Sequence, residues 1–437
     1  MANKPGEFLA CSFIASLAEN DSALYPKKCK TVFIYLVFIF HLLCKEILCY
    51  VCMQGEFAIF QDGIKIDCTL YCTRCIEMSH PFQAISLFSG CGGDTLGLEQ
   101  AGFKVVAFNE FKKFAIDTHL ANFPDSILLK DGNNSDITKV PDTVFTPYKG
   151  KVQIVFAGFP CQGFSKAGKK NAADPRNQMF RQFLRVTKAV RPQFIIGENV
   201  TGLQTMKTGP NETDPLVLDV ICKEFMDAGY QIYYKQVDAT DFGVPQKRKR
   251  VILVGWDTLS TNIKPIIPES FWASVAEHGQ KLPRTSLATF VSNSMEGAYQ
   301  IPEAFVPDDF SDFALRVDEA VIPTGTPHPY VILKSNQDLL SCSKRISPIH
   351  SEIVDVNRPS KTIICTYDHQ PRLLVGLRKP SGISYCRTLH PDELKQVQGF
   401  PSNFILTGSK KDQVTQIGNA VPPAIIQSVA SVLKALL

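Results

Sequence analysis

The sequence has 437 residues, of which 45% are apolar and 20% are charged, and it therefore predicts a soluble globular protein of about two or three domains. Its formal net charge of +4 at pH 7 is too small to indicate nucleic-acid binding by itself. The basic residues are nevertheless unevenly placed, because they gather in 166–191 and 247–250, while 308–319 is acidic. Such runs fit local phosphate contacts and ordinary solvated faces about equally well.

Residues 1–80 differ from the rest of the chain. An apolar run at 31–43 follows a group of lysines; it is short for a membrane span and has about the length of a signal-peptide core. No cleavage site of small residues follows it, since Lys45 and Glu46 come next. We therefore expect no membrane as a partner. We recognise no counterpart of this segment, and a start codon assigned too far upstream is one explanation of it.

Cysteine usage predicts a reducing compartment. Eight of the 14 cysteines lie in the first 75 residues, and the others are scattered singly, which is not a disulfide framework. We therefore expect the cytoplasm or nucleoid, or the nucleus in a eukaryote. The pairs Cys49/Cys52 and Cys72/Cys75 fit the spacing of a zinc ribbon. One pair lies in an apolar stretch, so we favour a buried helix or a poorly ordered extension, and we predict no metal site.

From Pro81 onward, apolar strands alternate with helices. The expected strands are 83–88, 104–110, 152–158, 193–200, 231–237 and 250–256; the expected helices are 95–102, 114–123, 179–190 and 214–230. Asp214 is the expected N-cap of the last helix, and Gly229 lies near its end. Because the strands are continuously apolar, the pattern predicts an α/β fold with a mostly parallel, doubly wound sheet and helices on both faces.

The pattern changes after Trp256. Residues 258–374 are rich in Pro, Ser and short apolar pieces, without clear alternation of helix and strand, and predict a smaller, irregular domain. Helical signal returns at 390–400. A C-terminal helix is expected within 421–437, with Pro422 and Pro423 at its start.

Polar and glycine residues follow the first strands, where ligands of open α/β sheets bind. Phe88 and Gly90 open a glycine-rich turn that does not complete a dinucleotide fingerprint. Glu110 ends the second strand, where an acid can accept hydrogen bonds from a ribose, and Asp136 is a candidate acceptor for an adenine amino group. Each has an ordinary structural explanation, but together they suggest a cofactor that contains adenosine.

Three further features follow later strands. Cys161 comes after a strand and Pro160, in a loop with Lys166, Lys169 and Lys170; nearby positive charge favours the nucleophilic thiolate. Glu198 ends an apolar strand, so its pKa should be raised and it can act as an acid. The run 246–250 places Gln246, Arg248 and Arg250 on one face of an extended segment. A core cysteine, a solvated loop and surface salt bridges are the ordinary alternatives.

In this order the motifs resemble the DNA cytosine-5 methyltransferase family. "FSGCGG", "FPCQGFS", "GENV", "QKRKR", "RTLHPDELKQVQGFP" and "IGNAVPP" resemble six motifs of that family in order and spacing, over about 81–257 and 358–437. Two departures are modest: His390 stands where the family often has Thr or Ser, and "GNAVPP" differs from "GNSV" forms.

The resemblance implies a Rossmann-like S-adenosyl-L-methionine-dependent methyltransferase sheet in 81–257. It also implies a target recognition domain in 258–374 and a C-terminal part, 375–437, that returns to the catalytic domain. Cys161 would attack C6 of a flipped cytosine and Glu198 would protonate N3. Arg250, with Arg248 beside it, would hold the base carbonyl and Glu198, and Asn199 would support the loop. The matching cofactor positions are Phe88, Gly90, Glu110, Phe111, Asp136, Ile137, Pro160, Asn419 and Val421.

The resemblance also implies double-stranded DNA as substrate, a monomer, and a restriction endonuclease as a candidate partner. The nearest alternative is a tRNA cytosine-5 methyltransferase of the same architecture. Such enzymes carry a Cys-Phe-Thr tripeptide, whereas this chain has "ICTYD" at 364–368. A catalytically silent DNA-binding regulator is disfavoured because Cys161 and Glu198 are both present.

Overall fold

The computed structural model describes residues 58–61, 64–67, 82–160, 179–209, 211–306, 308–328, 332–333, 340–341, 352–368 and 371–437. The chain divides into two units, 1–80 and 81–437. In the first, strand β1 (Ala58–Gln61) pairs antiparallel with β2 (Ile64–Asp67). The cysteines at 49, 52, 72 and 75 lie outside the described residues.

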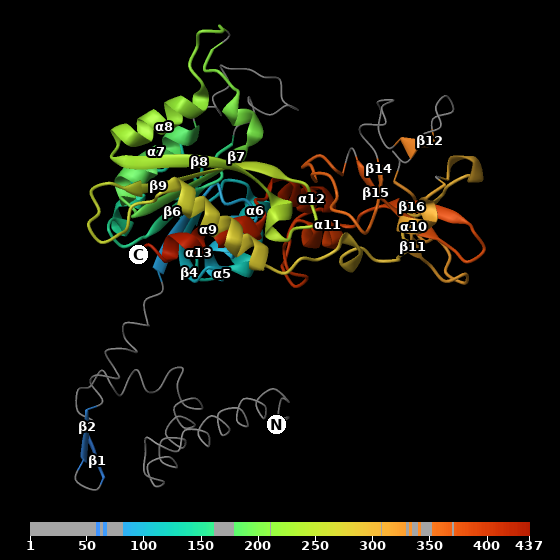
Figure 1. Ribbon diagram of the computed structural model, residues 1–437, viewed down its shortest axis with the longest axis horizontal. Coiled ribbons are helices and arrows are strands. Elements are labelled where there is room, and N and C mark those ends of the chain that lie inside the picture. Colours follow the sequence, from blue (N-terminus) through green and yellow to red (C-terminus); the bar gives the residue numbers. More distant parts are fainter. Residues whose placement is uncertain are drawn as a thin grey trace. The chain divides into compact units, whose positions relative to one another are not determined.

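The second unit is built on a seven-stranded sheet with the order β5-β4-β3-β6-β7-β9-β8 (Figure 1). Its strands are β3 (Phe82–Leu87), β4 (Phe103–Asn109), β5 (Ile127–Leu128), β6 (Ile154–Ala157), β7 (Phe194–Val200), β8 (Tyr230–Asp238) and β9 (Lys249–Asp257). The first five pair in parallel, whereas β9 runs antiparallel to both β7 and β8. The predicted α/β fold with a mostly parallel sheet is confirmed.

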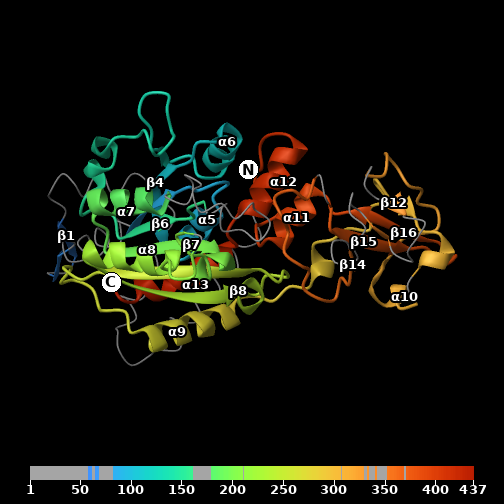
Figure 2. The ribbon, with the colours of Figure 1, turned by 90° about the horizontal axis from the view of Figure 1, so that it is seen from above.

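Helices cover both faces of this sheet, as the two views in Figures 1 and 2 show. The helices of the sheet region are α5 (Gly93–Gln100), α6 (Lys113–Asn122), α7 (Met179–Val190), α8 (Val217–Asp227), α9 (Pro268–Lys281) and α13 (Pro423–Lys434). The cores follow the two-residue period of a strand: on β3, Ile85 and Leu87 pack in the core with α7 and α8, whereas Ala84 packs in the core with α5, α9 and α13.

A smaller mixed sheet lies in the later part of the chain (Figure 2). Its path is β10 (Tyr299–Gln300), β16 (Ser384–Thr388), β15 (Leu373–Arg378) and β11 (Leu315–Arg316), and β14 (Glu352–Val354) also pairs with β15. Separately, β12 (Ile332–Leu333) pairs antiparallel with β13 (Leu340–Ser341). This region also contains helices α10 (Phe310–Phe313), α11 (Pro391–Val397) and α12 (Lys410–Asn419) and the short 3-10 helices η7 (Leu287–Thr289) and η8 (Glu303–Phe305).

Two sequence expectations need correction. Helix α8 begins at Val217 with Leu216 as its N-cap; Asp214 instead accepts a hydrogen bond from the Asn211 backbone N–H at 2.7 Å, because Pro215 separates it from the helix. The expectation of an irregular segment from 258 onward missed α9, whose buried face contains Phe271, Trp272 and Val275. Pro268 at its first position favours a helix start.

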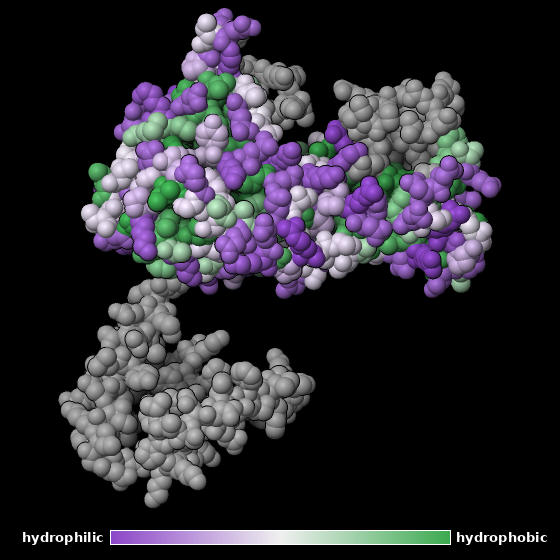
Figure 3. Space-filling model, in the orientation of Figure 1, coloured by the Kyte–Doolittle hydropathy of each residue, from purple (hydrophilic) through white to green (hydrophobic). Residues whose placement is uncertain are grey.

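The visible face of the second unit carries mostly hydrophilic residues with scattered apolar ones (Figure 3). Among the described residues, no helix combines the length and the apolar character that crossing a membrane requires.

Candidate active site

The turn after β3 is shaped by left-handed backbone at Phe88, Gly90 and Gly92, with φ of 55°, 53° and 87°. Positive φ is uncommon for a residue with a side chain, so Phe88 is locally strained. A Cβ added at Gly90 would meet nothing within 4 Å, whereas one at Gly92 would lie 2.7 Å from the Phe123 ring. The backbone at Gly90 therefore faces open space, where a ligand can approach it closely.

Glu110 holds the ends of two strands together. Its Oε2 accepts a hydrogen bond from the Gly90 N–H at 3.0 Å, and its Oε1 accepts from the N–H groups of Phe111 and Lys112 at 2.8 and 2.9 Å. The carboxylate is thus fixed by backbone donors and keeps lone pairs for a ligand. Phe111 beside it is 66% exposed, so its ring is free to stack on a planar group.

Asp136 and Ile137 lie in the segment after β5. Asp136 Oδ1 accepts hydrogen bonds from the Thr138 N–H and hydroxyl at 3.1 and 2.8 Å, as a turn residue does. Ile137 is buried, and its carbonyl accepts from Arg185 at 2.7 Å. Asn109, which the sequence analysis missed, donates to the carbonyls of Leu129 and Ser135 at 2.9 and 3.0 Å. Its only sequence signal was its position directly before Glu110.

Glu198 and Arg250 form an ion pair, with Arg250 Nε 2.8 Å from Glu198 Oε1 and side chains 12% and 13% exposed. The antiparallel pairing of β7 with β9 brings them together, since Val200 lies opposite Arg250. Burial raises the pKa of Glu198, and the charges of Arg250 and Arg248 oppose that rise only in part. A carboxyl with a raised pKa can hold and donate a proton.

The same carboxyl lies near the end of β6, because Glu198 Oε2 is 3.9 Å from the position of a Cβ on Gly158. The neighbouring Asn199 is buried and donates from Nδ2 to the Phe159 carbonyl at 3.0 Å. Asn199 thereby fixes the backbone just before Pro160. Cys161 itself and the lysines at 166, 169 and 170 lie outside the described residues.

Arg248 occupies a different place from the one we expected. Its side chain is 1% exposed, and it donates to the carbonyls of Ile363, Gly418 and Ala420 at 3.1, 2.9 and 2.9 Å. Arg248 precedes β9 where the chain runs beside 360–363, so its side chain enters a buried space lined by carbonyls. It acts on Glu198 through its charge, and its hydrogen bonds go to the backbone.

Asn419 is the last residue of α12, and Val421 lies in the turn between α12 and α13. Asn419 is exposed and Val421 is buried. A Cβ at Gly93 would overlap the Val421 carbonyl, and one at Gly418 would overlap the backbone of Cys365. Close backbone approach therefore brings this C-terminal turn against the glycine-rich turn after β3.

Asp94 is a buried acid that the sequence analysis did not single out. The Ser86 hydroxyl donates a hydrogen bond to Asp94 Oδ2. Burial raises the pKa of Asp94 to about 7 despite that hydrogen bond, and the charge of Glu198 adds to the rise. The only sequence signal was an acid directly after the glycine pair.

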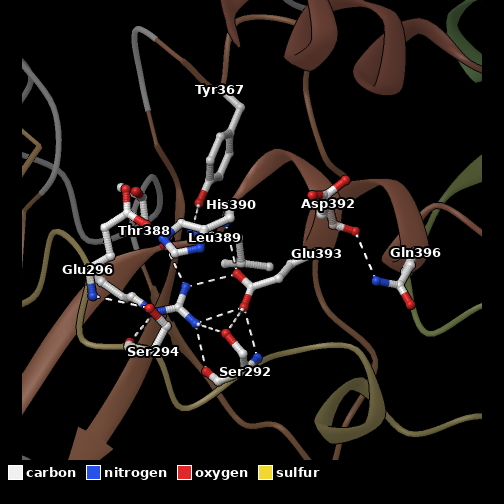
Figure 4. Close-up of polar contacts among 11 residues, drawn as sticks. Ser292, Ser294, Glu296, Tyr367, Thr388, Leu389, His390, Asp392, Glu393 and Gln396 are labelled. Atoms are coloured by element: carbon white, nitrogen blue, oxygen red, sulfur yellow. Dashed lines mark hydrogen bonds and ion pairs between the residues drawn. The ribbon is translucent and has the colours of Figure 1, made fainter. Parts of the chain in front are cut away.

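The region of "RTLHPDE" is held by an ion pair of Arg387 with Glu393, at 2.7 Å. Glu393 also accepts from the N–H and hydroxyl of Ser292 at 2.8 and 2.9 Å and from the His390 N–H at 2.8 Å (Figure 4). Burial opposes ionisation of Glu393, but the Arg387 hydrogen bonds and charge outweigh it and lower the pKa. His390 thus starts α11 where the family often has Thr or Ser. Within the part of the chain that the structure describes, no group of three or more His, Cys, Asp or Glu residues could hold a metal ion.

Residues 82–435 match the model of the C-5 cytosine-specific DNA methylase family. The chain is 30% identical over 398 residues to the type II methyltransferase M1.HphI of Haemophilus parahaemolyticus, covering 87% of this chain and 96% of that protein. It is 30% identical to the type II methyltransferase M.NlaX of Neisseria lactamica, covering 82% and 97% of the two chains.

Two solved structures resemble the fold. A prophage-encoded E. coli protein described as a DNA modification methyltransferase has a TM-score of 0.54 at 23% identity, covering 81% of this chain and 99% of its own. The S. pombe Dnmt2 methyltransferase has a TM-score of 0.55 at 16% identity, covering 81% and 98%.

Proposed function

Because the chain belongs to the C-5 cytosine-specific DNA methylase family and is a DNA cytosine-5 methyltransferase, we propose that it methylates C5 of a flipped cytosine in double-stranded DNA with Cys161 as the nucleophile. The methyl donor in this proposal is S-adenosyl-L-methionine. The observation that carries the proposal is the ion pair of Glu198 with Arg250, whose carboxyl faces the end of the strand that leads to Cys161.

The chemistry of the base falls to three side chains. The thiolate of Cys161 adds to C6 of the cytosine, while Glu198 donates its proton to N3, so that negative charge does not accumulate on the ring. Arg250 holds Glu198 and the base carbonyl. Once C5 carries the methyl group, loss of its proton to solvent expels the Cys161 thiolate, N3 returns its proton to Glu198, and the aromatic ring is restored. Since a paired cytosine is out of reach, the base must first leave the duplex, at a cost of about a few kcal/mol.

The supporting residues are proposed to position this chemistry. Asn199 holds the Phe159 carbonyl and so sets the start of the loop that carries Cys161. The lysines at 166, 169 and 170 would meet DNA phosphates. Arg248 is proposed to contribute charge near Glu198.

The turn after β3 fits an adenosine-containing cofactor, because the open backbone at Gly90 and the exposed ring of Phe111 flank the fixed carboxylate of Glu110. We propose that these residues hold the cofactor together with Phe88, Asp136, Ile137, Pro160, Asn419 and Val421. When bound, S-adenosyl-L-methionine supplies the methyl group. Glu110 would accept hydrogen bonds from the ribose hydroxyls, and Phe111 would stack on the adenine.

For the domains, we propose that 81–257 is catalytic, that 258–374 contains the target recognition domain, and that 375–437 returns to the catalytic domain. Helix α9 shares a core with α5 and α13, which favours a boundary after Lys281 for the recognition part. We also propose that the enzyme is a monomer, and the type II names of the relatives support a cognate restriction endonuclease as its partner.

Bisulfite sequencing of plasmid DNA tests the proposal. The chain is expressed in a host without cytosine-5 methylation, beside the variant Cys161→Ala. We expect methylated cytosines in one sequence context with the parent chain and none with the variant. Methylation of the host's tRNA with unmodified plasmid would support the tRNA alternative, and methylated DNA with Cys161→Ala would overturn the covalent step.

A further inference from the structure

Three fully buried polar side chains form a network next to the catalytic ion pair. Gln246 and Gln398 are both 0% exposed, and Arg248 is 1% exposed. Gln246 Nε2 donates to Gln398 Oε1 at 2.5 Å, so the two amides are joined directly. Burying a polar group costs free energy unless it is hydrogen-bonded, so each bond in this network matters to its neighbours.

One end of the network holds the turn before α13. The carbonyl of Ala420 accepts two hydrogen bonds, from Arg248 Nη2 at 2.9 Å and from Gln398 Nε2 at 2.6 Å. The carbonyl of Gly418 accepts a third, from Arg248 Nη2 at 2.9 Å. These carbonyls stand on either side of Asn419, so the network fixes the backbone that presents Asn419 and Val421.

The other end holds Ile363. Gln246 Oε1 accepts from the Ile363 N–H at 3.0 Å, and Arg248 Nη1 donates to the Ile363 carbonyl at 3.1 Å. The adjoining backbones are also paired, since the Lys247 N–H donates to Ser360 and the Ser360 N–H donates to Pro245, at 2.8 and 3.0 Å. The network therefore joins the segment 360–363 to the start of β9, the strand that carries Arg250.

A buried guanidinium is retained against a large loss of hydration. Burial lowers the pKa of Arg248, and the nearby Arg250 lowers it further. Its hydrogen bonds go to backbone carbonyls of two separate segments, and this geometry is suited to fixing backbone. The planar fork of arginine is pre-organised for such multiple donation.

We propose that Gln246, Arg248 and Gln398 are positioning residues, which fix the turn 418–421 relative to the Glu198–Arg250 pair and thereby set cofactor affinity without touching the base. This inference rests on the proposed function, in which Asn419 and Val421 contact the cofactor. The rival assignment is direct contact of Arg248 with the flipped cytosine.

Cofactor affinity without DNA separates the two assignments. S-adenosyl-L-methionine and S-adenosylhomocysteine are titrated calorimetrically into the full chain and its variants. Arg248→Met and Gln398→Met are expected to weaken binding about tenfold or more, the usual effect of losing hydrogen bonds to a charged or buried group. In steady state, KM for the cofactor rises by a similar factor, while kcat changes much less.

Two further variants complete the design. Arg248→Lys restores most of the affinity, because an ammonium group donates to carbonyl oxygens but cannot replace a planar fork on a base. Arg284→Met is the matched control: Arg284 also donates to two backbone carbonyls, at 3.0 and 3.3 Å, and its loss leaves cofactor affinity unchanged.

Wild-type affinity in both Arg248→Met and Gln398→Met overturns the positioning role. So does a loss of kcat in Arg248→Lys at unchanged cofactor affinity, which would indicate base contact. If Arg248→Met does not fold, Gln398→Met still tests the positioning role. This neutral and nearly isosteric substitution removes one of the two donors to the Ala420 carbonyl. Failure of the parent chain to bind either compound would instead overturn the proposed function.

Discussion

The two sides of the candidate active site differ in composition, because one consists mainly of backbone groups and the other of charged side chains. The side after β3 and β4 is made of backbone: left-handed glycines and amide groups gathered by the carboxylate of Glu110. The side at the end of β7 and the start of β9 is made of charged side chains that are mostly buried, with Glu198 and Arg250 at its centre. A surface formed by backbone groups is suited to binding a ligand that is the same in every reaction cycle, whereas mostly buried charged side chains are suited to transferring a proton. Damage to one side should therefore leave the other side largely intact.

The largest effect is expected from Glu198→Ala. Losing the proposed proton donor should lower kcat by about 10²- to 10⁴-fold, while cofactor affinity stays near the parent value. Single-turnover transfer of a labelled methyl group and a separate cofactor titration measure the two quantities. An equal loss of cofactor affinity would contradict the division between the two sides.

The pH dependence sharpens this prediction. Because burial raises the pKa of Glu198, the carboxyl keeps its proton to a higher pH than an exposed glutamate does and loses it as the pH rises further. Activity of the parent chain should therefore fall on the alkaline side of its profile. In Glu198→Gln an amide N–H, which does not titrate, takes the place of the carboxyl proton. The low residual activity of this variant should therefore not fall on the alkaline side of the profile.

On the side after β3 and β4, Asp94→Asn should change how the free energy of unfolding depends on pH. The pKa of Asp94 is about 7 in the folded chain, against an ordinary 3.8, so the folded state holds a proton that the unfolded state releases. Stability is then full below pH 4 and falls as the pH rises from about 4 to about 7, by at most about 4 kcal/mol. Asp94→Asn should remove this fall and raise Tm at pH 8 relative to the parent. An equal Tm difference at pH 4 and pH 8 would count against it.

Asn199→Ala should act on the charged side through the backbone. It leaves the Phe159 carbonyl without its side-chain donor, at a cost of about 1–3 kcal/mol, and it loosens the start of the loop that carries Cys161. We expect a lower kcat with cofactor affinity retained, and Asn199→Asp should not rescue it, because a carboxylate cannot donate. Chemical denaturation and kinetics test this together, and an unchanged kcat would refute the role.

The smallest effects are expected from Gly90→Ala and Gly92→Ala, which separate ligand approach from folding. Both positions have positive φ, so each alanine costs about 1–2 kcal/mol. At Gly92 the new Cβ also meets Phe123, so stability falls more there. At Gly90 the new Cβ enters open space. Gly90→Ala should therefore lower Tm less than Gly92→Ala does, but it should weaken cofactor binding more. The reverse ranking would show that the open space is not used.

The mostly parallel sheet could be predicted from the sequence, and so could the candidate residues that follow successive strands. Both predictions rest on apolar runs and glycine-rich turns, which are local signals. The start of α8 at Val217 rather than near Asp214 could not be predicted, because several residues within one turn were equally plausible first residues of the helix. Helix α9 was missed because its polar residues and its position after the prolines concealed a narrow buried face, which packs against α13 and against Phe242, both remote in sequence.

The candidate site was predictable to the same degree. The positions of Glu198 and Arg250 follow from the motif order, but the direction of Arg248 does not. An extended segment suggests that Arg248 and Arg250 share a face, yet Arg248 precedes β9 and turns toward carbonyls at 363, 418 and 420. Long-range backbone partners of this kind leave no local signal, and the burial of Asp94 is concealed for the same reason.

The contact of Gly93 with Val421 also has a consequence for biosynthesis. The ribosome releases the glycine-rich turn first and must add residues 94–420 before Val421 can reach it. Until α13 has also been made, α5 lacks the apolar helix that covers it. A nascent chain can therefore form most of its sheet while the glycine-rich turn still lacks its contact with Val421, so that this part of the candidate site is completed only after the sheet.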